Sequence, residues 1–166
     1  MTAKKVNLSD YGKITEQVSD DYTIGIVVSE WNSEITNALL DGAVATLKEL
    51  GIKKSSLIIE HVPGSFELPL GAQYIIDSCL ADAVICLGCV IQGETRHFDF
   101  ICQAVSHQIA QLNMDYSIPV IFGVLTTDTM QQALDRAGGK HGNKGVEAAA
   151  AAIKMLHLRD RLDANN

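Results

Sequence analysis

The chain has 166 residues, of which 47% are hydrophobic, and a formal net charge of −7. This length and composition predict one compact domain with a full core and exclude a disordered chain. The acidic balance argues against a nucleic-acid partner, because proteins that bind phosphate backbones are usually basic. No apolar run approaches the roughly 20 residues of a membrane-spanning helix, and the N-terminal stretch lacks the apolar core of a secretory signal. We therefore expect a cytoplasmic protein that binds neither nucleic acid nor membranes.

Four short apolar runs separated by helical patterns determine the predicted fold. The runs predict strands at residues 24–28, 56–60, 83–91 and 119–125. Because helices connect them, the strands are expected to lie parallel in one sheet that is covered on both faces. The expected fold class is α/β, a three-layer α/β/α sandwich with a four-stranded parallel sheet in flavodoxin-like order. Residues 1–22 are polar and weakly patterned and predict a flexible N-terminal arm, which leaves residues 23–166 as a single domain.

Most of the helical patterns begin at a residue whose side chain suits an N-cap. The expected capping residues along the chain are Asn32 or Ser33, Thr95, Thr127 and Asn143. A further helix is expected over residues 67–79, after a turn at Pro63 and Gly64. The glycine-rich residues 137–142 are expected to form a bend between the last two helices.

The chain has four cysteines, and two of them, Cys86 and Cys89, form a CxxC pair that also occurs at metal and redox sites. Both lie in the predicted strand at residues 83–91, where residues three apart point to opposite faces and cannot share a metal ion. We interpret them as buried structural thiols. No histidine pair has the spacing of a zinc enzyme, and His141 and His157 are expected at the surface or at helix ends. No metal site is expected.

The stretch after the third predicted strand carries the clearest indication of function. The strand stops at Gln92 and Gly93, and a helix is expected to open at Thr95. A strand that ends at a glycine before a helix leaves backbone N–H groups without partners, an arrangement that binds anions. His97 lies in the first turn of that helix, where its imidazole could transfer protons. Together these features predict chemistry on a phosphorylated small molecule.

Other candidate residues follow the remaining strands, and ligands of such sheets bind beyond the carboxyl ends of the strands. Trp31 either offers a flat face to a heteroaromatic ring or packs on the domain. Glu67 is either a ligand for bound N–H groups or a first-turn acid favoured by the helix dipole. Arg136 and Lys140 can hold a phosphate through charge-assisted hydrogen bonds. All of these candidates are expected to meet at one edge of the sheet.

Over residues 24–155 these segments together resemble the lumazine synthase family, the 6,7-dimethyl-8-ribityllumazine synthases. The resemblance rests on four motifs in the family's order: Trp31-Asn32, residues 63–67, residues 90–98, and residues 119–127 followed by 136–145. It implies a transferase of riboflavin biosynthesis that needs no cofactor and no metal. The implied reaction condenses 5-amino-6-(D-ribitylamino)uracil with 3,4-dihydroxy-2-butanone 4-phosphate and releases phosphate and water, the penultimate step of that biosynthesis.

The resemblance also implies a role for each candidate residue. His97 would transfer protons, and Trp31 would stack on the pyrimidine. The implied ligands of the pyrimidine and its ribityl chain are Ser65, Phe66, Glu67, Cys89, Val90 and Ile91. The implied phosphate ligands are Glu94, Thr95 and Arg136, and the charge of Lys140 places it with them. In the family, the residues at Phe122 and Arg136 come from the neighbouring subunit, so the site is expected to span an interface.

Self-association follows from the same resemblance. A pentameric ring is the family's basic unit, and an uninterrupted bend such as residues 138–143 accompanies closure into a sixty-subunit shell. Riboflavin synthase is a candidate partner. The alternative is a flavin-binding or shell-forming homologue without catalysis, which the presence of Thr95, His97 and Arg136 disfavours. A flavodoxin-like electron carrier is disfavoured because no phosphate loop rich in Ser and Thr follows the first strand.

Overall fold

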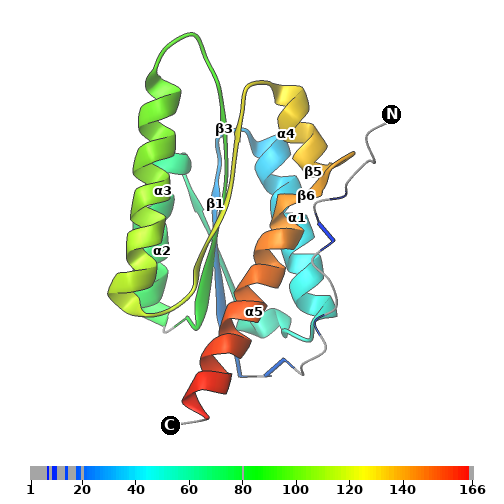
Figure 1. Ribbon diagram of the computed structural model, residues 1–166, viewed down its shortest axis with the longest axis vertical. Coiled ribbons are helices and arrows are strands. Elements are labelled where there is room, and N and C mark those ends of the chain that lie inside the picture. The colour runs from blue at the N-terminus through cyan, green and yellow to red at the C-terminus, as the bar shows by residue number, and fades with distance from the viewer. Residues whose placement is uncertain are drawn as a thin grey trace.

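The computed structural model describes residues 21–79 and 81–164, together with Asn7, Ser9, Asp10, Ile14, Val18 and Ser19. Within these residues, four parallel strands form the central sheet in the order β2-β1-β3-β4. They are β1 (Ile24–Ser29), β2 (Leu57–Val62), β3 (Ala83–Ile91) and β4 (Val120–Thr127). The expected α/β class and the four-stranded parallel sheet are therefore confirmed (Figure 1).

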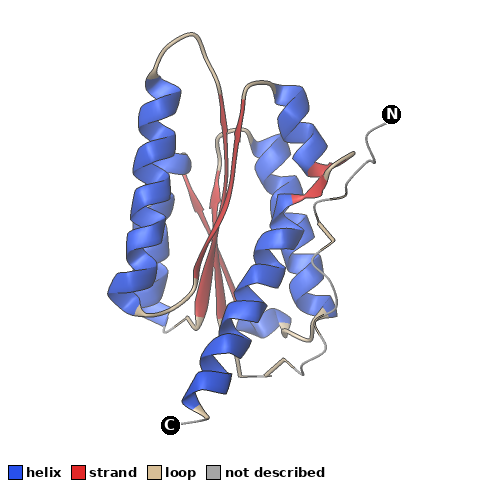
Figure 2. Cartoon of the chain, viewed as in Figure 1, coloured by secondary structure: helices blue, strands red, loops and turns tan. Residues whose placement is uncertain are grey.

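Helices cover both faces of this sheet, which gives the three layers that Figure 2 shows. One face carries α2 (Leu68–Cys79) and α3 (His97–Tyr116), and the other carries α1 (Ser33–Glu49), α4 (Met130–Arg136) and α5 (Lys144–Asp163). Two short 3₁₀ segments, Lys54–Ser56 and Ser65–Glu67, lead into β2 and α2. A small antiparallel hairpin of β5 (Ala137–Gly139) and β6 (Gly142–Asn143) joins α4 to α5.

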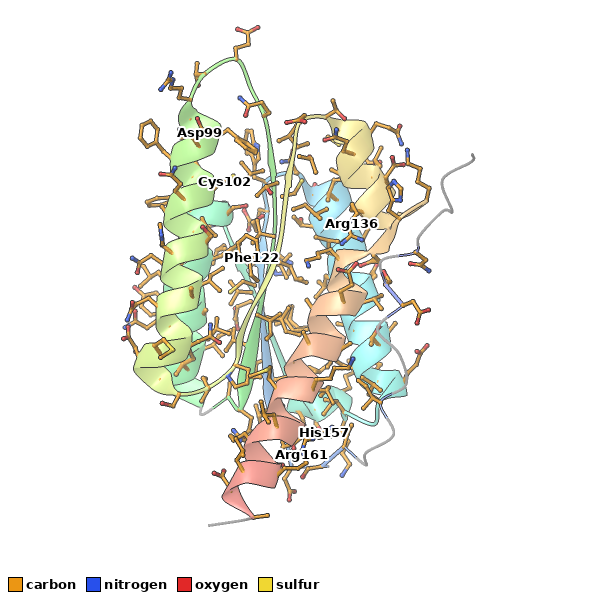
Figure 3. All side chains as sticks on the ribbon, in the orientation of Figure 1. Asp99, Cys102, Phe122, Arg136, His157 and Arg161 are labelled. Atoms are coloured by element: carbon orange, nitrogen blue, oxygen red, sulfur yellow. The ribbon has the colours of Figure 1, made fainter. Side chains whose placement is uncertain are left out.

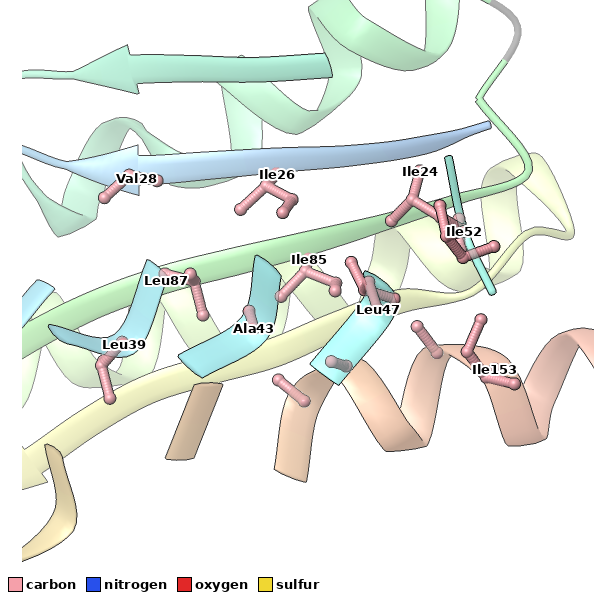
Figure 4. Packing of buried hydrophobic residues seen from close by; sticks show 14 of the residues in the cluster. Ile24, Ile26, Val28, Leu39, Ala43, Leu47, Ile52, Ile85, Leu87 and Ile153 are labelled. Atoms are coloured by element: carbon pink, nitrogen blue, oxygen red, sulfur yellow. The ribbon is translucent and has the colours of Figure 1, made fainter. Parts of the chain in front are cut away.

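Strand β3 lies in the middle of the sheet and is buried on both faces, as its continuous apolar run predicts. Ile85 packs in the cluster under α1 and α5, where Figure 4 shows it among Ile26 and Leu47. Cys89 faces that same cluster, whereas Cys86 faces the cluster under α2 and α3. Burial raises the pKa of Cys86 to about 12 and that of Cys89 to about 11. The two thiols are buried on opposite faces and cannot share a metal ion.

Two of the expected helix caps are wrong. Helix α3 begins at His97 with Arg96 at its N-cap, so Thr95 precedes the helix, and its hydroxyl accepts a hydrogen bond from the His97 N–H at 3.4 Å. Helix α4 is capped by Thr129, whose hydroxyl accepts from the N–H of Gln132 at 3.2 Å. Thr127 cannot serve there, because it is still paired with β3 as the last residue of β4.

Asn143 caps α5 as expected, since its Oδ1 accepts a hydrogen bond from the N–H of Gly145 at 2.8 Å. Its Nδ2 also donates to the carbonyl of Ala38 in α1 at 2.8 Å, so the cap joins two helices. The bend before it is a hairpin, and Gly138 and Gly142 take the positive φ values that its turn requires. His157 is a further correction: it is buried on α5 rather than exposed.

The expected flexible arm falls mostly on residues that lie outside the described part of the chain. Of its described residues, Val18 and Tyr22 belong to the cluster under α1 and α5, and the Ser9 hydroxyl donates to the carbonyl of Asn143 at 3.1 Å. Within the described residues, every helix is too short or too polar to span a lipid bilayer.

Candidate active site

A cleft of about 660 Å³ opens where β1, β2 and β3 end. Its lining consists of Trp31, Asn32, Gly64, Ser65, Phe66, Glu67, Cys89, Val90, Ile91, His97 and Ile101. The volume and the mixture of aromatic, apolar and polar groups suit a small organic ligand. All of the residues that were expected to contact a pyrimidine and its ribityl chain therefore lie together.

Two aromatic side chains are exposed at this cleft. Trp31 is 73% exposed and Phe66 is 57% exposed. The Trp31 backbone is fixed, because its N–H donates to the Pro63 carbonyl at 3.2 Å and the neighbouring Glu30 N–H donates to Val62 at 2.8 Å. An exposed ring on a fixed backbone favours stacking on a ligand over packing on the domain.

The 3₁₀ segment Ser65–Glu67 packs closely against β3, and Gly88 makes this possible. A Cβ at Gly88 would lie 2.7 Å from the Ser65 hydroxyl and 2.8 Å from the Leu68 side chain. The Ser65 hydroxyl is buried at the cleft wall and has no hydrogen-bond partner among the described residues. Since buried polar groups are nearly always paired, this hydroxyl is a candidate ligand contact.

Asn32 lines the cleft, whereas from the sequence it was expected as a possible helix cap and as part of the motif Trp31-Asn32, without a binding role of its own. It occupies the N-cap position of α1 in a left-handed conformation, with φ 59°, and its side chain makes no capping bond. Instead Nδ2 donates to the carbonyl of Cys89 at 2.9 Å. Gly64, from the motif at residues 63–67, also lines the cleft, as does Ile101, which was not expected there. Only the sequence position of Asn32 beside Trp31 pointed to such a role.

The loop between β3 and α3 borders the cleft. His97 is the first residue of α3, is exposed and contributes to the lining. The backbone N–H groups of Gly93, Glu94 and Thr95 have no hydrogen-bond partner within the described chain. These N–H groups and the helix dipole of α3 suit an anion that lies beside the imidazole. Glu94 and Thr95 do not line the cleft themselves, so the loop extends the site outward.

Three expected site residues lie away from the cleft of their own chain. Phe122 is half-buried on the edge strand β4 and packs toward α2 and α3. Arg136 ends α4 in the opposite layer, as Figure 3 shows. Lys140 lies in the turn after Arg136 and pairs with Asp135, at 2.8 Å between Nζ and Oδ2. Arg136 and Lys140 therefore do not join the other candidates in the cleft of their own chain, although position along the sequence alone placed every candidate at the same edge of the sheet.

Arg136 and Lys140 form ion pairs with carboxylates around the β5–β6 hairpin. Hydrogen bonds from Lys140 and Gln131 hold the pKa of Asp135 below its usual range, despite the opposing effect of burial. The guanidinium of Arg136 lies against the carboxylate of Glu147 in α5. Lys144, which was not expected at the site, also contacts Glu147, at 3.3 Å between Nζ and Oε2. Elsewhere in the described chain, no group of His, Cys, Asp and Glu side chains is arranged to hold a metal ion.

Comparisons with known proteins agree with this fold and cleft. A family model described as 6,7-dimethyl-8-ribityllumazine synthase matches residues 21–160. A Cytophaga hutchinsonii protein of that name is 58% identical over 94% of this chain and 98% of its own. Proteins of the same name from Porphyromonas gingivalis (54% identical, over 92% of this chain and 94% of its own) and Phocaeicola vulgatus (52%, over 94% and 93%) are similar throughout.

The fold and the cleft define an α/β enzyme domain with a site for a small molecule at the carboxyl edge of its sheet. The chain belongs to the 6,7-dimethyl-8-ribityllumazine synthase family, a family of transferases of riboflavin biosynthesis.

Proposed function

We propose that the chain condenses 5-amino-6-(D-ribitylamino)uracil with 3,4-dihydroxy-2-butanone 4-phosphate to give 6,7-dimethyl-8-ribityllumazine, inorganic phosphate and water. The observation that carries this proposal is the position of His97. His97 lines a cleft with exposed Trp31 and Phe66 rings, and it directly follows a loop whose backbone N–H groups have no partner among the described residues. One substrate offers a flat heteroaromatic ring, which suits the cleft, and the other offers a phosphate, which suits the loop.

The cleft would bind the pyrimidine. The ring stacks on Trp31 and Phe66, while Glu67, the Ser65 hydroxyl and the backbone of Cys89, Val90 and Ile91 offer hydrogen bonds to its polar edge and to the ribityl hydroxyls. Asn32 keeps its Oδ1 for the same hydroxyls, because only its Nδ2 is engaged with Cys89. This supports a site that orients a long polar substrate along the ends of three strands.

The phosphorylated substrate would bind at the start of α3. Its phosphate accepts hydrogen bonds from the N–H groups of residues 93–95, which the helix dipole reinforces. The pyrimidine amine then attacks the ketone, water leaves to form an imine, phosphate is eliminated and the ring closes with loss of a second water. His97 moves protons in these steps, which typically contributes roughly 10²–10⁴-fold, and the larger gain comes from holding both substrates in contact.

Phe122 and Arg136 would act in the cleft of a neighbouring chain. Two observations support this: neither residue lines the cleft of its own chain, and β4 is an edge strand of the sheet. The proposed assembly is a pentameric ring, in which each chain supplies one cleft and completes the next. The compact β5–β6 hairpin, without an inserted segment, supports further closure into a sixty-subunit shell, and riboflavin synthase is proposed as its partner.

The test is an assay of lumazine formation from the two purified substrates, with each substrate omitted in turn as a control. Product that requires both substrates supports the proposal. The opposing hypothesis, a flavin-binding homologue without catalysis, is favoured if ligand quenches the fluorescence of Trp31, the one tryptophan in the chain, while no product forms. Light scattering tests the assembly separately: a pentamer of the 17.9 kDa chain has a mass of about 90 kDa, five times 17.9, and a shell is far larger.

A further inference from the structure

Arg136 is held in a fixed orientation by its own chain. Nη2 donates to Oε2 of Glu147 at 2.9 Å, and Nη1 donates to the main-chain carbonyl of His141 at 2.8 Å. Nη1 also lies 2.7 Å from Oε1 of Glu147, an ion-pair contact in which no N–H is aligned on that oxygen. Both side chains are largely buried, at 17% and 18% exposure, so the pair has little freedom to rearrange.

These contacts leave one edge of the guanidinium unused. An arginine carries five N–H donors in a planar fork, arranged as an end edge of Nη1 and Nη2 and a side edge of Nε and Nη2. Glu147 lies beside Nη1 and Nη2, and the His141 carbonyl accepts a hydrogen bond from Nη1. Neither Nε nor the second N–H of Nη2 has a partner among the described residues. Nε and Nη2 form the side edge of the fork, whose N–H groups suit two oxygens of a phosphate.

We propose that Glu147 is a positioning residue, which clamps Arg136 so that its Nε–Nη2 edge is presented to the phosphate of the substrate in a neighbouring cleft. The inference rests on the proposed function of Arg136 and adds a second residue to it, one that touches no substrate. The cluster keeps a net positive charge, because Lys144 contacts the same carboxylate from the other side at 3.3 Å. A phosphate that binds here therefore approaches the two positive charges of Arg136 and Lys144, which are only partly balanced by Glu147.

The carboxylate is charged at neutral pH, as this role requires. Burial raises the pKa of Glu147, but the hydrogen bond from Arg136 and the charges of Lys144 and Arg136 outweigh it, so the pKa lies below its usual range. The opposing hypothesis is that this carboxylate competes with phosphate for the guanidinium. The two roles predict opposite effects of removing its charge.

The experiment compares Glu147→Gln with the parent enzyme in its assembled state. The substitution keeps the size of the side chain but weakens the clamp, so we expect the KM for the phosphorylated substrate and the inhibition constant of inorganic phosphate both to rise by about tenfold, the equivalent of one charge-assisted hydrogen bond. The KM for the pyrimidine and the assembly size should not change. Asp163→Asn removes the same charge from the exposed far end of α5 and is the matched control.

Arg136→Lys is the second variant, and it keeps the charge without the fork. Its inhibition constant for inorganic phosphate should rise as much as that of Glu147→Gln. Adding Glu147→Gln to Arg136→Lys should then cause no further rise. A fall in the phosphate inhibition constant of Glu147→Gln would show that Glu147 competes with phosphate and would overturn the inference. If Glu147→Gln binds phosphate like the parent while Arg136→Ala binds it weakly, the positioning role of Glu147 is overturned and the phosphate role of Arg136 stands. Parent-like binding by Arg136→Ala overturns the proposed phosphate role of Arg136 itself.

Discussion

The side-chain amide of Asn32 donates a hydrogen bond to the main-chain carbonyl of Cys89, with 2.9 Å between nitrogen and oxygen. Asn32 follows β1 and Cys89 lies near the end of β3, so the bond joins two strand ends at the floor of the cleft. The backbone of Asn32 is left-handed, with φ 59°, a conformation that asparagine and glycine adopt more readily than other residues. One residue thus determines both the course of the chain after Trp31 and the distance between two walls of the site.

Asn32→Gly and Asn32→Ala separate these two contributions. Glycine keeps the left-handed conformation and loses only the hydrogen bond, worth about 1 kcal/mol, whereas alanine adds about 1–2 kcal/mol of backbone strain. We therefore expect Asn32→Ala to be the less stable variant in urea unfolding and both variants to bind a pyrimidine ligand more weakly. Equal stability of the two variants would show that the left-handed backbone costs nothing here.

His97→Ala should lower turnover by roughly 10²-fold while ligand binding persists, because a proton-transfer group contributes to the chemical steps rather than to stacking. Binding is followed by quenching of Trp31 fluorescence, and turnover by lumazine formation. His107→Ala is the matched control, since His107 is exposed on the same helix and does not line the cleft. A variant at His97 that loses binding but keeps its turnover would contradict the proposed role.

Gly145→Ala should unfold at clearly lower urea concentration than the parent. A Cβ at this position would overlap the main-chain carbonyl of Leu39, so α1 and α5 would have to separate, at a cost of about 1–3 kcal/mol or more. Gly93→Ala is the control for stability, because no atom lies within 4 Å of a Cβ placed there. Equal unfolding midpoints for the two variants would show that the helices separate at no cost.

Stability should fall between pH 10 and pH 12 because of Tyr22. Burial, followed by the hydrogen bond to Asp160, raises its pKa from 10.0 to about 12. The unfolded chain therefore releases this proton at lower pH than the folded chain does, so the contribution is complete below pH 10 and is lost toward pH 12. Tyr22→Phe should reduce the pH dependence of urea unfolding in this window; an unchanged slope would assign it to other groups.

The architecture could be predicted because its signals are local and repeated. β3 is a continuous apolar run, and a strand buried on both faces requires such a run. The starts of α3 and α4 were misplaced because the choice of N-cap depends on more than the local pattern. Arg96 rather than Thr95 occupies the N-cap of α3, and at α4 Thr127 and Thr129 compete, so the deciding factor is how far the neighbouring strand stays paired. For β4 that pairing extends to Thr127, opposite Ile91. No local pattern contains this information.

Some residues of the candidate site could likewise be placed from local sequence patterns, whereas others depend on long-range packing. The cleft residues follow the strand ends, so the general rule for parallel sheets places them together. The layer in which Arg136 lies depends instead on α4 packing with α1 and α5, a long-range arrangement. Lys140 pairs with Asp135 only because the β5–β6 hairpin folds back on α4. His157 is buried under Tyr22, a residue far away in sequence.

Cys86 and Cys89 are buried on opposite faces of the sheet, so their chemical labelling can report separately on the two core clusters. A thiol alkylates through its thiolate, and both thiols are buried with raised pKa values, so each reacts only when its own layer opens. Cys86 then records the opening of the layer of α2 and α3, and Cys89 that of the layer of α1 and α5. Because Cys89 also lines the cleft, a bound ligand should delay its labelling more than that of Cys86. The chain thus carries two built-in reporters, one of which also senses occupancy.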